Sequence, residues 1–163
     1  KMQIDTLPRL LALTFLWLAL SACSSLLVNQ YAFYPTKHDA SVPALDNEWV
    51  NEIQIETEDG EQLQAFYYPQ PQSTCALLYL HGNAGSAYRR VDRLRPIADL
   101  GCSLLLLSYR GYGKSTGRPT EQGVYLDARA ALNYLKEQGF EAQQTIVLGR
   151  SVGAAVAVDL AQD

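Results

Sequence analysis

Positive charge is scarce in this chain. Its 163 residues contain 13 lysines and arginines against 17 acidic residues, which gives a net charge of −4. A protein that follows the phosphates of nucleic acid needs a cationic surface, so the composition speaks against a nucleic-acid partner. The one basic cluster, residues 88–95, has helical spacing and is most simply a solvated helix face. Contact with anionic lipid headgroups is the alternative for this cluster.

The chain also has no apolar run long enough to cross a membrane. Lys1 and Arg9 precede a short apolar stretch, residues 10–20, that ends in small residues. A bilayer core of about 30 Å takes roughly 20 apolar residues, so a permanent transmembrane helix is the weaker interpretation. A basic start, a short apolar segment and small residues are typical of a signal peptide, which we place at residues 1–22.

The end of this segment, Leu20-Ser21-Ala22-Cys23, resembles the lipobox of bacterial lipoproteins. The resemblance implies cleavage before Cys23, followed by acylation of its sulfur and of the new amino terminus. Several acyl chains would hold the protein on a membrane, where one short chain binds only marginally. Ser24 after the cysteine favours, by the same resemblance, the outer membrane and its periplasmic side. An ordinary signal peptide that happens to contain a cysteine is the alternative.

Two further cysteines, Cys75 and Cys102, each precede an apolar, strand-like run. They could therefore lie at the same end of neighbouring strands, and export would make a disulfide chemically possible. Buried free thiols are the simpler interpretation. The sequence leaves the bridge open.

The mature chain divides into a tether and a domain. Residues 23–47 comprise the cysteine to be lipidated and a polar, irregular segment with few periodic apolar positions, which predicts a tether. Its aromatic residues Tyr31, Phe33 and Tyr34 could pack on the domain or lie at the membrane interface. Residues 48–163 carry the periodic patterns of a folded domain.

Those patterns predict an open α/β sheet. Alternation over residues 48–57 and 62–68 around Asp59-Gly60 predicts an antiparallel hairpin. Three apolar runs without alternation predict strands buried on both faces, as in a parallel sheet: residues 75–80, 103–108 and 145–148. Two helix patterns lie between them.

The first helix pattern covers about residues 86–100, is interrupted by Pro96 and is closed by Gly101. The second covers about residues 120–138 and places one apolar stripe toward the core. This stripe consists of Val124, Ala128, Ala131, Leu132 and Leu135.

The pentapeptide at residues 149–153, Gly-Arg-Ser-Val-Gly, stands where the last apolar run becomes a helix pattern. A G-x-S-x-G serine nucleophile stands on a sharp strand-to-helix turn, where the flanking glycines remove side chains that would clash. We therefore predict Ser151 as a nucleophile, with Gly149 and Gly153 in support. A serine that merely caps a helix is the structural alternative.

A second motif, His81-Gly82-Asn83-Ala84-Gly85, directly follows a predicted buried strand. Acyl transfer needs N–H donors aimed at the developing oxyanion, and one usually comes from such a loop. We predict the backbone N–H groups of Asn83 and Val152 as the two donors. We expect His81, beside Gly82, to hold this loop through hydrogen bonds rather than to act as the general base.

A third motif permits a rival interpretation. Gly113-Lys114-Ser115 after a buried strand is the second half of a P-loop, which would indicate a nucleotide-binding domain. The P-loop pattern requires a glycine where this chain has Ser108. It also requires a helix to start at once, whereas Gly117 and Pro119 would break one.

Together these motifs resemble an α/β-hydrolase fold serine hydrolase. The residues that carry the resemblance are 81–85, 109–115, 119–123, 127–132 and 149–153. They are most similar to the small, often membrane-associated subfamily related to serine aminopeptidases and prolyl oligopeptidases. The resemblance implies a mostly parallel sheet opened by an antiparallel strand pair. It also implies a small-molecule or peptide acyl substrate, and neither a metal nor an organic cofactor.

In α/β-hydrolases the catalytic acid and then the histidine follow the serine along the chain. Here His38 and His81 both precede Ser151, while Asp159 and Asp163 lie too close to it, on the helix that it begins. We therefore expect the sequence to be a fragment, truncated after the nucleophile strand and helix and inactive by itself. A lipid-anchored binding protein or pseudoenzyme is the alternative from another functional class.

Overall fold

The computed structural model describes residues 10–11, 14, 31–37 and 49–162. Cys23, Ser24 and His38, and with them the lipobox and most of the predicted signal peptide, lie outside the described residues. Among the helices that are described, none combines the length and the hydropathy that a membrane span requires.

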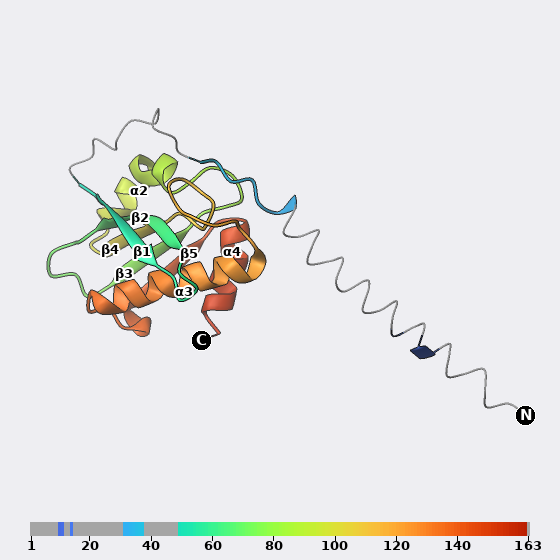
Figure 1. The fold of residues 1–163 in the computed structure, drawn as a ribbon. Helices are drawn as coiled ribbons and strands as arrows, with labels where there is room; N and C mark the ends of the chain where they lie inside the picture. Colours follow the sequence, from blue (N-terminus) through green and yellow to red (C-terminus); the bar gives the residue numbers. More distant parts are fainter. Residues whose placement is uncertain (1–9, 12–13, 15–30, 38–48, 163) are drawn as a thin grey trace, which may run out of the picture.

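The domain is built on one five-stranded sheet (Figure 1). Its strands are β1 (Asn51–Glu56), β2 (Gln62–Tyr68), β3 (Ala76–Leu80), β4 (Ser103–Leu107) and β5 (Thr145–Gly149), in the order β1-β2-β4-β3-β5. β2 pairs antiparallel with both β1 and β4, and β3 pairs parallel with both β4 and β5. Gly60 turns the β1–β2 hairpin with a φ of 85°. The predicted α/β sheet, opened by an antiparallel pair, is confirmed.

Helices cover both faces of this sheet. A short 3-10 helix, η1 (Tyr88–Arg90), leads into α2 (Val91–Ala98) on one face, while α3 (Glu121–Glu137) and α4 (Val152–Leu160) pack on the other (Figure 1). A second 3-10 helix, η2 (Ala142–Gln144), precedes β5. Every residue of β3 and β4 is buried, as predicted for strands covered on both faces. Along these strands the side chains alternate, Leu78 packing toward α3 and Leu77 toward α2.

The first helix differs from its prediction at Pro96. The sequence pattern indicated an interruption there, but α2 continues through Pro96 to Ala98. Proline removes only its own N–H from the helix ladder, and Pro96 lies on the exposed side near the last turn. Gly101, with a φ of 95°, follows the helix as expected.

The last strand is less buried than predicted. β5 lies at the edge of the described sheet, and its residues Ile146 and Leu148 are 54% and 39% exposed. Val147 points to the other face and packs against the core beneath α3 and α4. The sheet order is the reason, because α2 covers the strands near the centre of the sheet and leaves this face of β5 open.

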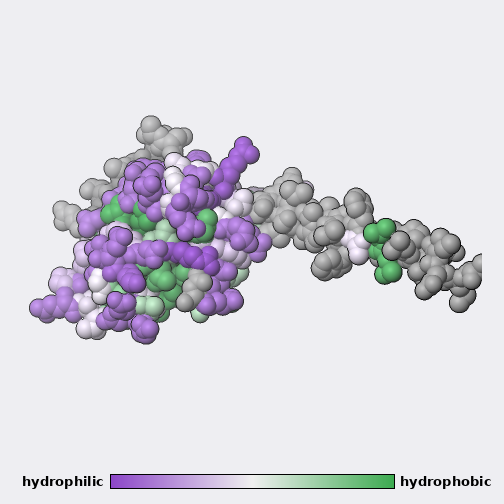
Figure 2. Space-filling model, turned by 60° about the horizontal axis from the view of Figure 1, so that its bottom comes forward, coloured by the Kyte–Doolittle hydropathy of each residue, from purple (hydrophilic) through white to green (hydrophobic). Residues whose placement is uncertain are grey.

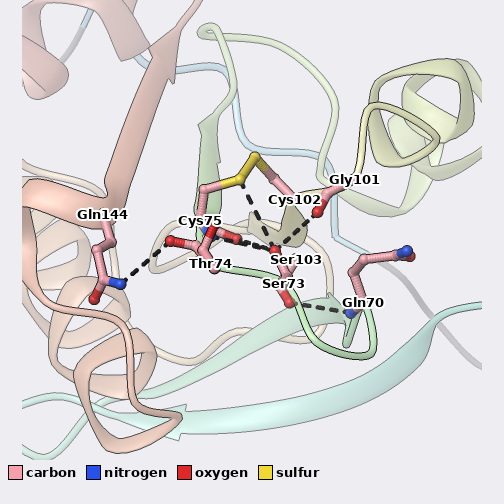
Figure 3. Close-up of a disulfide and its surroundings, with 8 residues drawn as sticks. All are labelled: Gln70, Ser73, Thr74, Cys75, Gly101, Cys102, Ser103 and Gln144. Carbon is pink, nitrogen blue, oxygen red and sulfur yellow. Dashed lines mark hydrogen bonds between the residues drawn. A yellow bond between two sulfur atoms is a disulfide. The ribbon is translucent and has the colours of Figure 1, made fainter.

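The interpretation of Cys75 and Cys102 as buried free thiols is wrong. The two residues are only partly buried and form a disulfide, with Cα atoms 4.9 Å apart (Figure 3). Each cysteine comes directly before a strand, and the register of these strands pairs Ala76 with Ser103. This pairing brings the cysteines within the usual disulfide range. The hydroxyl oxygen of Ser73 lies within hydrogen-bond distance of the carbonyl oxygens of Cys75 and Gly101, at 2.7 and 2.8 Å, and so links the same strand ends.

Part of the predicted tether lies against the domain. Phe33 is 7% exposed and packs in the core, while Tyr31 and Tyr34 are exposed. The segment is fastened at two points, by a bridge between Tyr34 and Ala84 and by one between Lys37 and Gly113. Elsewhere the surface is largely hydrophilic on the face shown in Figure 2, with apolar side chains in separate patches.

Candidate active site

Ser151 stands at the turn between β5 and α4. Its backbone has a φ of 55° and a ψ of −120°, a conformation that side-chain-bearing residues rarely adopt, and the residue is exposed. The turn is held on both sides. The Arg150 N–H donates to the Leu80 carbonyl at 3.0 Å, and the Gly153 N–H donates to the Arg150 carbonyl at 2.9 Å. The exposed serine is thus raised on a strained, tightly held turn.

The glycines around Ser151 are needed for close packing. A Cβ at Gly149 would collide with the backbone of Gly153, and one at Gly153 would collide with the Leu80 carbonyl. At Gly82 an added Cβ would lie 3.3 Å from the Cβ of Ser151. The loop after β3 therefore passes directly beside the candidate nucleophile.

His81 orients the peptide that carries the Asn83 N–H. Its Nδ1 lies 2.6 Å from the Gly82 carbonyl oxygen. A carbonyl only accepts, so Nδ1 carries the proton and donates. The Gly82 carbonyl and the Asn83 N–H belong to one trans peptide unit and point in opposite directions. Fixing this carbonyl therefore fixes the direction of the N–H that the sequence analysis selected as an oxyanion donor.

The environment of His81 keeps its ring neutral. The pKa of His81 is lowered to about 4, chiefly by burial and to a smaller extent by the positive charge of Arg90, while the hydrogen bond to Gly82 opposes the shift. The ring packs against Tyr109 and Tyr112, with ring centroids 4.5 and 4.9 Å away. Its Nε2 is buried without a hydrogen-bond partner in the described structure. A buried, neutral ring bonded to its own loop suits a positioning role better than proton transfer.

Two residues that sequence reasoning missed hold the next peptide of the loop. The Asn83 carbonyl accepts hydrogen bonds from the Tyr112 hydroxyl at 2.7 Å and from the Tyr34 N–H at 3.0 Å. Burial raises the pKa of Tyr112 to about 12, so its hydroxyl keeps the proton that it donates. Tyr112 belongs to a motif that the sequence analysis noted, but its partner Asn83 lies 29 residues earlier. The second donor position, Val152, is the first residue of α4, where an N–H has no acceptor within the helix.

An ion-pair network anchors the loop that carries Tyr112. The Arg110 guanidinium binds Asp59 in the hairpin turn with contacts of 2.7 and 2.9 Å, and its Nε donates to Asp127 of α3 at 2.8 Å. The hydrogen bonds from Arg110 lower the pKa of Asp59 to about 2. Burial raises the pKa of Asp127 to about 6, although Arg110 opposes this shift. The network joins the hairpin, the loop after β4 and α3.

The P-loop interpretation of Gly113-Lys114-Ser115 does not hold. The next helix, α3, begins only at Glu121, so these residues do not lie at a helix start. Lys114 instead donates to Glu52 at 2.7 Å, and the Ser115 hydroxyl donates to the Ser108 carbonyl at 2.9 Å. The described residues contain no group of three or more metal-ligating side chains placed to hold an ion.

Comparison with known proteins agrees with this geometry. The family model for the alpha/beta hydrolase fold matches residues 76–163. The protein bem46 of Schizosaccharomyces pombe is 36% identical over 130 residues, which cover 77% of this chain and 44% of the yeast protein. The chain spans roughly two fifths of the length of the curated relatives it matches.

Two solved structures share the arrangement. An alpha-beta hydrolase from Vibrio vulnificus has a TM-score of 0.63 and 32% identity, over 72% of this chain and 41% of that protein. The esterase Pf2001 of Pyrococcus furiosus has a TM-score of 0.61 and 26% identity, over 78% of this chain and 50% of the esterase. The residues that the family model matches include β3 with its following loop and the whole strand-turn-helix around Ser151. This chain belongs to the alpha/beta hydrolase fold family.

Proposed function

We propose that the protein is a serine hydrolase that cleaves an ester, thioester or amide through an acyl-enzyme, with Ser151 as the nucleophile. The observation that carries the proposal is the strained, exposed backbone of Ser151 at the β5–α4 turn, with Gly82 packed beside it. Membership of the alpha/beta hydrolase fold and the likeness to an esterase support the same reaction class.

In the proposed reaction the Ser151 Oγ forms a bond to the carbonyl carbon and its proton passes to a base. The carbonyl oxygen becomes an oxyanion, which accepts hydrogen bonds from the N–H groups of Asn83 and Val152. Collapse of this intermediate breaks the bond to the leaving group, which departs with a proton from the base. The base then takes a proton from a water molecule, whose oxygen forms a bond to the acyl carbon. When this second intermediate collapses, the bond to the Ser151 Oγ breaks, the acid product leaves and the base returns a proton to the serine.

We propose that the base and its acid are a histidine and a carboxylate outside this sequence. His81 is engaged with Gly82 and buried, and the chain spans about two fifths of its relatives' length. The exposed apolar residues Ile146 and Leu148 on β5 also suit a sheet that continues beyond this strand in the complete protein.

A fluorophosphonate probe tests this proposal on the complete protein. We expect covalent labelling and ester hydrolysis, with both lost in Ser151→Ala. Thr74→Ala, which removes an exposed hydroxyl far from the turn, is the matched control and should keep both. A folded protein that the probe does not label would refute the nucleophile and favour a binding protein or pseudoenzyme.

We also propose that the protein is exported and anchored through lipid on Cys23, facing the periplasm from the outer membrane. The Cys75–Cys102 disulfide supports an oxidising compartment. Metabolic labelling with a clickable fatty acid should mark the wild type and not Cys23→Ser. Equal labelling of the two proteins would contradict lipidation at this residue.

A further inference from the structure

A basic hollow lies beside the loop that follows β3. Its volume is about 560 Å³, and it is lined by Thr36, Ala84, Gly85, Arg89, Arg90 and Arg93. Half of these residues are arginines, and no acidic residue of the described part of the chain is among them. Asp92 lies in the same helical turn but does not line the hollow. The helical spacing of these arginines favours a solvated helix face, whereas in the structure three of them line one hollow.

Arg90 is held against the loop. Its Nη2 donates to the Ala84 carbonyl at 2.9 Å, and its Nη1 lies 3.1 Å from the position that a Cβ on Gly85 would occupy. Its Nε is buried and has no hydrogen-bond partner in the described structure. Because the contact with Ala84 already fixes the guanidinium, Arg90 can present its charge to an anion in the hollow with little further ordering.

Arg89 and Arg93 are exposed, and neither forms an ion pair with another described residue. Their charges are therefore not neutralised within the described fold. Arginine binds carboxylate and phosphate groups through paired N–H donors, and several arginines around one hollow match such an oxyanion in charge and geometry.

The hollow is close enough to the candidate nucleophile for one small substrate to reach both. Gly82 packs against Ser151, and Gly85, which lines the hollow, is three residues further along the loop. Successive Cα atoms are about 3.8 Å apart, so the two glycines are separated by at most about 11 Å. The charge of Arg90 also contributes to the lowered pKa of His81, which lies next to Gly82. The positive field of the hollow thus extends to the site.

We propose that this arginine hollow binds an anionic phosphate or carboxylate group that the substrate carries several bonds from its scissile carbonyl. This inference rests on the proposed hydrolase function and assigns its substrate class, namely anionic acyl compounds. A concave site next to the oxyanion loop favours a substrate group over a flat lipid surface.

Kinetics on the complete protein test the proposal. The 4-nitrophenyl monoester of glutaric acid is compared with neutral 4-nitrophenyl pentanoate, and the butyryl ester of glycerol 3-phosphate with that of glycerol. We expect the anionic member of at least one pair to have the higher kcat/KM. Arg93→Gln should lower that anionic-to-neutral ratio about tenfold. Arg95→Gln, on the same helix but outside the hollow, should leave the ratio unchanged.

Direct binding separates failure of this inference from failure of the hydrolase proposal. Inorganic phosphate and glutarate are titrated calorimetrically into Ser151→Ala protein, with and without Arg93→Gln. Saturable binding that Arg93→Gln weakens would support the hollow even if no ester were hydrolysed, in which case only the hydrolase proposal fails. If esters are hydrolysed, but Arg93→Gln leaves the anionic-to-neutral ratio of kcat/KM unchanged and no saturable anion binding is seen, only the anion-binding inference is overturned. The anion-binding inference would likewise be overturned if Arg93→Gln reduced only the binding of the protein to phosphatidylglycerol vesicles.

Discussion

Acidification should destabilise the protein through His81. The folded state lowers the pKa of this ring from 6.5 to about 4, chiefly by burial. Between pH 6.5 and about pH 4, His81 is protonated in the unfolded chain but neutral in the folded protein, so the free energy of unfolding falls as the pH drops. At about 1.4 kcal/mol for each pKa unit, the loss between pH 7 and pH 4 is about 3 kcal/mol.

The control for this experiment is His81→Asn, whose side-chain amide can still donate toward Gly82 but does not titrate in this range. Urea unfolding of both proteins at pH 7 and pH 4 gives the change in free energy of unfolding with pH. Asp127, whose pKa is about 6, titrates in both proteins, so its effect cancels in the comparison. The wild type should lose about 3 kcal/mol more than the variant.

Equal losses in the two proteins would refute the reasoning. A second measurement does not depend on how the variant folds: the pKa of His81 read from its ring proton shifts by NMR in the wild type. A value of 6 or higher would show that burial does not hold the ring neutral.

Three further substitutions test the framework of the site. Arg110→Leu should lower the free energy of unfolding by about 3–5 kcal/mol in urea, because it leaves Asp127 buried without its cation. Gly153→Ala should lower the unfolding free energy by about 1–3 kcal/mol and weaken probe labelling, since its methyl group meets the carbonyls at the end of β3. Replacing both Cys75 and Cys102 by serine should cost about 3–4 kcal/mol, the chain-entropy value for a crosslink spanning 27 residues.

Matched substitutions separate these effects from general damage. Lys114→Gln breaks an exposed ion pair with Glu52 and should cost less than about 1 kcal/mol. Ala155→Ser adds one polar atom on the exposed side of α4 and should leave labelling intact. A cost for Arg110→Leu as small as that for Lys114→Gln would contradict the buried network. Identical gel migration of the wild type with and without reductant, together with two reactive thiols, would contradict the disulfide.

Much of the fold could be predicted because its signals are local. The hairpin at Gly60, the two buried strands and the stripe of α3 follow from patterns within a few residues of one another. The strand-turn-helix around Ser151 was equally visible, since Gly149 and Gly153 remove side chains from a crowded turn. The same locality made the loop at 81–85 recognisable.

The remaining features depend on which distant segments meet. The sheet order sets β3 beside β4, which joins Cys75 to Cys102, and it sets β5 at the edge, which leaves Ile146 exposed. No pattern near Arg110 reveals that its carboxylate partners lie 51 residues before it and 17 after it.

The sequence by itself thus determined the element types, the turn that raises Ser151 and the loop at residues 81–85, because steric limits on short segments leave few conformations. Only the tertiary structure decided the disulfide, the Arg110 network, the hydrogen bonds from Tyr34 and Tyr112 to Asn83, and which arginines of residues 88–95 line one hollow with Thr36. These features arise from contacts between segments whose separation along the chain carries no record of their distance in space.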